Sequence, residues 1–210
     1  ADNALPTATI GKGSPTAVQF GRASNFPEPW RDALFILDWA YGRVVACHLY
    51  PRGAGYYCRS ETFLKGRPLN VTDVDFGPDG AMYLITGGRK TESSLYRVRW
   101  VGESTVPEQA PPHLVARKAF SAQQRELRHR LERWHVRSKG GNAVAGIWPH
   151  LMNPDPSIRH AARVALEHQD IKEWRDRALR ESHTSTAAVS LLALARGSAA
   201  QDFPAIISTL

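Results

Sequence analysis

The stretch Gly77-Pro78-Asp79-Gly80-Ala81-Met82-Tyr83-Leu84 places a tight turn between two β-strands. Residues 71–76 before the turn alternate apolar and polar side chains, as a half-buried strand does, and residues 81–86 begin a second strand. Gly87-Gly88 ends that strand, and residues 94–100 alternate again as a third. Three short antiparallel strands at this spacing are typical of one blade of a β-propeller.

The preceding sequence repeats this pattern. Four further strands are predicted over residues 16–20, 33–39, 43–50 and 56–63, and Pro51-Arg52-Gly53-Ala54 predicts a hairpin turn between the last two. Residues 33–38 align with residues 81–86, so the chain holds about two blades, of which the second lacks its fourth strand. A propeller closes only with roughly four to eight blades. We therefore expect residues 1–104 to be the C-terminal blades of a longer propeller.

Composition excludes several classes of function. The 210 residues are 42% hydrophobic, and no apolar run approaches the roughly 18 residues of a membrane helix, so no membrane span is expected. The net charge of +7 is spread among interspersed basic and acidic residues, and no nucleic-acid recognition motif is present. A nucleic-acid partner is therefore not predicted.

The two cysteines, Cys47 and Cys58, fall on the two arms of the predicted hairpin. A turn centred on Arg52-Gly53 places them opposite one another, so either a cross-strand disulfide or two half-buried free thiols fit the pattern. No Cys-x-x-Cys pair and no adjacent histidine point to zinc or haem attachment.

The composition of the sequence and the spacing of its apolar residues change after Trp100. Residues 101–112 contain Gly102, Pro107, Pro111 and Pro112 and few apolar side chains, which predicts a linker over residues 105–116. Residues 117–210 then show a helical period, with helices predicted over residues 121–136 (closed by Gly140-Gly141), 142–152, 157–168, 171–181 and 186–195. The segment from Asp155 to Leu166 resembles the second helix of a HEAT repeat, a family in which residues such as Asp155 and Arg159 tie neighbouring repeats together. The predicted fold class is therefore a partial β-propeller followed by an α-helical HEAT-like solenoid.

The two halves together resemble a known arrangement. The segments Pro15-Thr16-Ala17-Val18-Gln19-Phe20, Ala33-Leu34-Phe35-Ile36-Leu37-Asp38-Trp39 and Val71-Thr72-Asp73 through Gly88-Arg89 look like the last blades of the glucose/sorbosone dehydrogenase-like propeller. In the planctomycete-type membrane-bound dehydrogenase family, such a propeller is followed by HEAT-like repeats and often by a c-type cytochrome domain. The resemblance implies a periplasmic or cell-envelope protein that oxidises sugars or alcohols with pyrroloquinoline quinone (PQQ) and calcium.

The resemblance also implies that this chain lacks a complete active site. The catalytic histidine of the family lies in an earlier blade, and His48 falls inside a predicted strand, so no catalytic residue is assigned in this chain. The haem-attachment motif Cys-x-x-Cys-His is absent, so haem c is expected only outside this chain. The partners it implies are the rest of the parent propeller and a c-type cytochrome domain or protein partner on the helical repeats.

In a propeller, two kinds of loop lie at one end of the channel: those that follow the second strand of each blade and those that lead into the innermost strand of each blade. Asp38, Trp39, Asp73 and Arg89 are therefore the candidate cofactor-binding residues. In the parent protein Arg89 would clamp a quinone carboxylate with its planar guanidinium, and Asp38 or Asp73 would bind calcium or orient a sugar hydroxyl. Each has a structural alternative: Asp38 caps a turn, Asp73 bonds to nearby backbone, and Arg89 is a solvated loop charge. The alternative function is a non-catalytic interaction scaffold that uses the helical surface.

Overall fold

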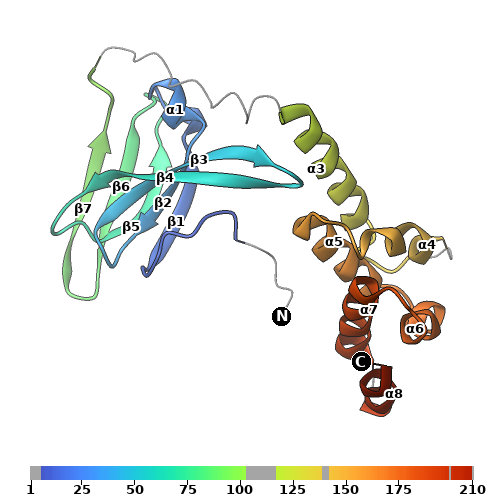
Figure 1. Cartoon of the computed structure of the whole chain (residues 1–210). Helices are drawn as coiled ribbons and strands as arrows, with labels where there is room; N and C mark the ends of the chain where they lie inside the picture. The colour runs from blue at the N-terminus through green and yellow to red at the C-terminus, as the bar shows by residue number, and fades with distance from the viewer. Residues whose placement is uncertain (1–5, 103–116, 139–141, 199, 210) are drawn as a thin grey trace. The chain divides into compact units, whose positions relative to one another are not determined.

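The computed structural model describes residues 6–102, 117–138, 142–198 and 200–209 (Figure 1). They form two compact units, which are described separately. The β unit holds residues 6–51 and 56–102, and the helical unit holds residues from 117 onward together with Arg52–Gly55. The predicted linker at 105–116 and the predicted helix stop at Gly140-Gly141 lie outside the described residues.

The β unit contains two antiparallel sheets. The first sheet has the order β1-β2-β3-β4, formed by Pro15–Phe20, Leu34–Asp38, Arg43–Arg52 and Gly55–Lys65. The second sheet has the order β5-β6-β7, formed by Val71–Phe76, Met82–Gly88 and Thr91–Val98. The predicted antiparallel β region is thus confirmed, with two sheets of four and three strands. The one-turn helix α1 (Glu28–Arg31), between β1 and β2, was not predicted.

The turn between β5 and β6 shows why the opening stretch folds as it does. Gly80 adopts φ +71°, a conformation that favours glycine, and its amide donates to the Gly77 carbonyl at 2.9 Å. Asp79 accepts from the Ala81 amide at 3.1 Å and from the Arg97 guanidinium at 2.9 Å. The Ala81 amide and Arg97 together lower the pKa of Asp79. These bonds hold the hairpin closed.

The two sheets pack against each other through apolar side chains. Phe35 and Leu37 of the first sheet are fully buried, as are Met82 and Leu84 of the second, and all four belong to one cluster. The other members of that cluster are Phe26, Ala33, Val44, Ala46, Leu69, Val71 and Val74. Phe35 and Phe63 meet edge to face with centroids 4.9 Å apart.

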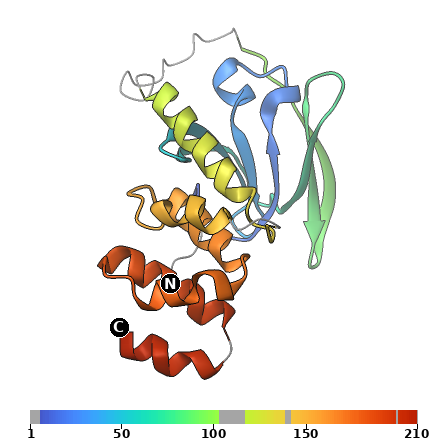
Figure 2. The same cartoon turned by 90° about the vertical axis from the view of Figure 1, so that its right-hand side faces the viewer.

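The helical unit contains, in its described residues, six α-helices (Figure 2). They are α3 (Lys118–Glu132), α4 (Ala143–Ile147), α5 (Pro156–Glu167), α6 (Ile171–Leu179), α7 (Thr184–Gly197) and α8 (Phe203–Thr209). The predicted C-terminal helical region is confirmed. The helix predicted over 142–152 divides into α4 and the 3₁₀ turn Trp148–His150, because Pro149 has no N–H to continue the α-helical pattern. α8 was not predicted.

Helix α5 lies at the centre of the helical unit, in contact with α3, α4 and α7. Its buried face carries Ile158, Ala161, Ala162, Ala165 and Leu166, whose small members let neighbouring helices approach closely. Asp155 caps this helix by accepting from the Ser157 amide at 2.8 Å, and its other oxygen accepts from the Ala54 amide at 2.7 Å. Arg159 donates to the Asn153 and Pro154 carbonyls, which lie six and five positions before it in the sequence.

None of the described helices has the length and apolar character required to cross a membrane.

Candidate functional site

Three loops meet at one end of the β unit, which we call the loop end. They are residues 39–42 between β2 and β3, residues 66–70 between β4 and β5, and residues 89–90 between β6 and β7. Trp39 joins them: its indole Nε1 donates to the Gly87 carbonyl at 2.8 Å, and its own carbonyl accepts from Asn70 Nδ2 at 3.1 Å. The Gly87 amide donates to the Asn70 carbonyl at 3.0 Å, which completes the network.

Arg89 lies over Trp39. Its guanidinium carbon is 6.0 Å from the centre of the Trp39 ring, within the range of a cation–π contact. Trp39 and Arg89, two of the four residues predicted to share this end, are therefore brought together. Arg89 is exposed, so its charge also faces solvent.

The turn that carries Arg89 has an unusual backbone. Gly88 pairs with Thr91, and the two residues between them, Arg89 and Lys90, both have positive φ, at 46° and 67°. Two-residue hairpin turns of this kind normally use Asn and Gly, because a Cβ at positive φ costs roughly 1 kcal/mol or more. The turn thus holds two cations in a conformation that the local sequence disfavours.

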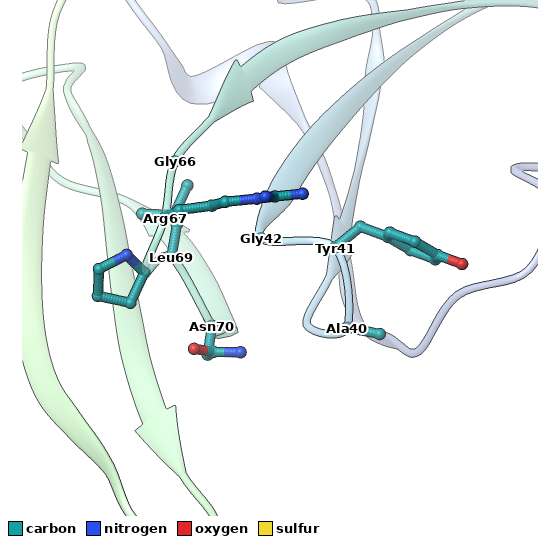
Figure 3. Close-up of a pocket in the computed structure, with 8 residues that line it drawn as sticks. Ala40, Tyr41, Gly42, Gly66, Arg67, Leu69 and Asn70 are labelled. Atoms are coloured by element: carbon teal, nitrogen blue, oxygen red, sulfur yellow. The ribbon is translucent and has the colours of Figure 1, made fainter.

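A cavity of about 120 Å³ opens between residues 40–42 and residues 66–70 (Figure 3). Its walls are the two facing loops, with residues Ala40, Tyr41, Gly42, Gly66, Arg67, Pro68, Leu69 and Asn70. Gly42 makes the close approach of the loops possible: it adopts φ +57°, and a Cβ there would lie 2.6 Å from the Gly66 carbonyl oxygen. Tyr41, Arg67 and Asn70 supply the polar groups of this cavity, and sequence reasoning missed all three. Arg67 could have been identified as a candidate binding residue, because it lies in the loop that leads into β5, one of the loops expected to form this end.

Asp38 is fully buried and is bound to neighbouring protein groups. Its Oδ1 accepts from the Ser14 amide at 2.9 Å, and its Oδ2 accepts from Arg43 Nε at 2.9 Å. Burial alone would raise the pKa of Asp38, but the Ser14 amide and the Arg43 guanidinium together hold that pKa below its usual value. The carboxylate therefore stays charged and fixes the N-terminal segment to the first sheet.

Asp73 is exposed on β5, and its Oδ1 accepts from the amide of the next residue, Val74, at 2.9 Å. Both Asp38 oxygens are engaged, and the described residues contain no group of three or more His, Cys, Asp or Glu side chains that could hold a metal ion. These residues do not fit a calcium site. His48 lies toward the opposite end of β3, where its ring nitrogens bind the Pro29 carbonyl and Glu61, both at 3.0 Å.

Cys47 and Cys58 are free thiols in the structure. They pack in a small cluster with Ile36 and Val45 on the outer side of the first sheet. Burial, followed by the neighbouring Cys58 thiol, raises the pKa of Cys47 to about 12. At neutral pH Cys47 is therefore a protonated, apolar side chain.

Comparisons with protein-family models, curated proteins and solved structures found no match to this chain.

Proposed function

We propose that the β unit is a two-blade part of a glucose/sorbosone dehydrogenase-like propeller and that its loop end binds an anionic, planar quinone of the PQQ type. The observation that carries the proposal is the placement of Arg89 over Trp39, the residue next in sequence to Ala40, which lines the same cavity as Arg67. Guanidinium groups match carboxylates in shape and charge, and an indole offers a face for a flat ring. These protein groups therefore suit a flat molecule that carries several carboxylates.

The repetition of three antiparallel strands in both sheets supports the propeller assignment, and the stacking of α3, α5 and α7 in one core supports HEAT-like repeats for the helical unit. In this proposal the rest of the propeller protein supplies the remaining blades and the catalytic histidine, and a c-type cytochrome domain holds any haem. The protein then works in the periplasm or cell envelope. The proposal assigns no calcium site to this chain, because the described residues contain no group of three or more His, Cys, Asp or Glu side chains that could hold a metal ion.

The test is a titration of the protein with PQQ, with and without calcium, followed by the absorbance of the quinone. We expect binding by the wild-type chain and a loss of about tenfold or more in affinity for Arg89→Ala and for Arg67→Ala, because each removes a charge-assisted hydrogen bond. Arg22→Ala is the matched control: Arg22 also lies over an aromatic ring, 5.1 Å from the centre of Phe20, but near the opposite end of β1. The absence of quinone binding by the folded wild-type protein would refute the proposal.

A second candidate is a non-catalytic interaction scaffold. Helix α8 exposes Phe203 (42%) and Ile207 (71%), spaced by four on one face, which a partner protein could cover. This candidate predicts no quinone binding and no effect of Arg89→Ala, so the same titration separates the two.

A further inference from the structure

His48 on β3 joins the β3–β4 hairpin to the short helix α1. Its Nδ1 lies 3.0 Å from the carbonyl oxygen of Pro29 in α1, and its Nε2 lies 3.0 Å from Glu61 Oε1 on β4. The side chain of His48 is only 17% exposed, so most of the ring is screened from water. The ring is therefore held between two oxygen atoms that come from different elements.

Both of these oxygens act only as hydrogen-bond acceptors. A peptide carbonyl has no proton to donate, and Glu61 is a carboxylate at neutral pH. Burial alone would raise the pKa of Glu61, but the hydrogen bonds from His48 and Trp30 together hold that pKa below its usual value. Trp30 Nε1 donates to the same Glu61 Oε1 at 2.9 Å.

The two bonds of His48 therefore require two N–H groups on one ring. A neutral imidazole has one N–H and one acceptor nitrogen, whereas an imidazolium donates from both nitrogens. If the neutral ring keeps its proton on Nδ1, the lone pair of Nε2 faces the Glu61 carboxylate; if it keeps the proton on Nε2, the lone pair of Nδ1 faces the Pro29 carbonyl. Loss of one proton thus breaks one of the two bonds in either tautomer.

The Pro29 carbonyl is one of the carbonyls at the end of α1, which the helix itself does not pair. The Ala33 amide, which follows α1, donates to the Trp30 carbonyl at 3.2 Å, and the Pro29 carbonyl accepts from His48. Trp30, the next residue, also packs against Trp100 with ring centres 5.3 Å apart. The bond to His48 therefore helps to fix both α1 and the position of the Trp30 ring.

The other charged groups on the elements around His48 are Arg59 on β4 and Glu28 and Arg31 on α1, all three exposed. On the other side of β3, the half of β2 beside His48 is apolar. Glu61 touches the ring directly, at 3.0 Å, and attraction between charges falls with distance and with screening by solvent. We therefore expect Glu61 to be the main charged partner of the ring.

We propose that His48 is a proton-dependent clasp between α1 and the β3–β4 hairpin. In its charged form the ring holds α1 through both nitrogens, and release of one proton opens one bond and loosens α1. Because both bonds need the charged ring, the clasp stabilises α1 at lower pH, and that contribution is lost as the pH rises. The clasp is independent of the ligand proposed for the loop end.

Nuclear magnetic resonance of the full chain tests the clasp. The ¹⁵N shifts of the His48 ring distinguish the imidazolium from each neutral tautomer, and the indole N–H of Trp30 and the amide of Arg31 report on α1. Between about pH 5 and 8, where imidazole side chains titrate, we expect the α1 signals of the wild type to shift with the same midpoint as the His48 ring. His48→Gln assigns the ring signals and should abolish that shift.

Glu61→Gln is the decisive variant, because a carboxamide has the shape of a carboxylate but carries a donor as well as an acceptor. Its oxygen can accept from Trp30 while its NH₂ donates to the Nε2 of a neutral His48, so both bonds of the ring survive without the extra proton. We expect His48 to release its proton at lower pH in this variant, and the α1 signals to lose their pH-dependent shift.

Glu132→Gln is the matched control. His129 Nδ1 lies 2.8 Å from Glu132 Oε2, but the His129 side chain is 53% exposed, and a neutral ring with its proton on Nδ1 can keep that single bond. The α1 signals of this variant should titrate as in the wild type. Three results would each overturn the clasp: α1 signals that stay fixed while His48 titrates, a pH-dependent shift that persists in Glu61→Gln, or a shift lost equally in Glu132→Gln.

Discussion

The buried ion pair of the helical unit gives a prediction whose size follows from the structure. Arg163 on α5 has a side chain only 4% exposed, and it is paired with Glu167, one turn later and 14% exposed. Glu167 also accepts from Arg196 on α7 at 2.9 Å. Removal of one partner from a buried pair leaves an uncompensated charge and costs about 3–5 kcal/mol. His160 remains 3.3 Å from the Arg163 guanidinium, so we expect the lower end, about 3 kcal/mol, for Glu167→Gln.

The assay is urea unfolding at pH 7, followed by the helical circular dichroism signal. With a urea dependence of about 2 kcal/mol per molar, the midpoint of helical unfolding should fall by about 1.5 M in Glu167→Gln. Glu126→Gln is the matched control on α3: Glu126 is 61% exposed and pairs with Arg133, which is 71% exposed. An exposed pair contributes about 0–1 kcal/mol, so its midpoint should barely move.

Equal shifts for the two variants would refute the reasoning, because burial would then not matter to the pair. The double variant Arg163→Met/Glu167→Leu adds a second check. Apolar residues of similar volume often replace a buried pair without loss, so the double variant should be more stable than Glu167→Gln. A double variant less stable than the single one would show that the charges themselves are needed.

Three further outcomes are expected. Lys90→Gly should raise the stability of the β unit by about 0.5–1 kcal/mol in thermal unfolding, because Lys90 has φ 67°; a loss of stability would contradict this. Asp155→Ala should destabilise the helical unit by about 2–3 kcal/mol, and Asp170→Ala by about 1 kcal/mol, since Asp155 also holds the amide of the buried Ala54; equal losses would contradict this. Folding raises the pKa of Cys47 from 9.0 to about 12, so in this interval the folded state keeps a proton that the unfolded state loses, and the free energy of unfolding should fall as the pH rises. Cys47→Ala should remove that part of the pH dependence, as measured by urea titrations at each pH.

The sequence predicted the elements well wherever one residue type controls the backbone. Pro78, Asp79 and Gly80 form the turn that the opening stretch indicates, and the apolar alternation around it placed β5 and β6. The helix predicted through Pro149 ended early, since the effect of that proline on the hydrogen-bond pattern was overlooked. α8 was missed although Phe203, Ile206 and Ile207 recur at spacings of three and four, because a helix of seven residues holds less than two full turns of that pattern.

The candidate site was predictable in part. Trp39 and Arg89 meet as expected, because the turns they occupy follow the second strand of each sheet, β2 and β6, at the same end of the unit. Asp38 is adjacent to Trp39 in sequence, but strand alternation directs it to the Ser14 amide and Arg43. The cavity beside Arg67 depends on how closely Gly42 and Gly66 approach, a distance that sequence periodicity does not encode.

The bond between Ala54 and Asp155 also affects the order of folding. The two residues are 101 positions apart, and Ala54 is fully buried in the core cluster of the helices. Closing so long a loop has an entropic cost that must be met before the contact stabilises anything, and contacts of large sequence separation slow folding. We therefore expect the helical core to be completed only after the β3–β4 hairpin has formed and Ala54 can enter it. If the chain were cut after residue 116, the helices in the C-terminal fragment would lack Ala54, and its place in their core would be empty.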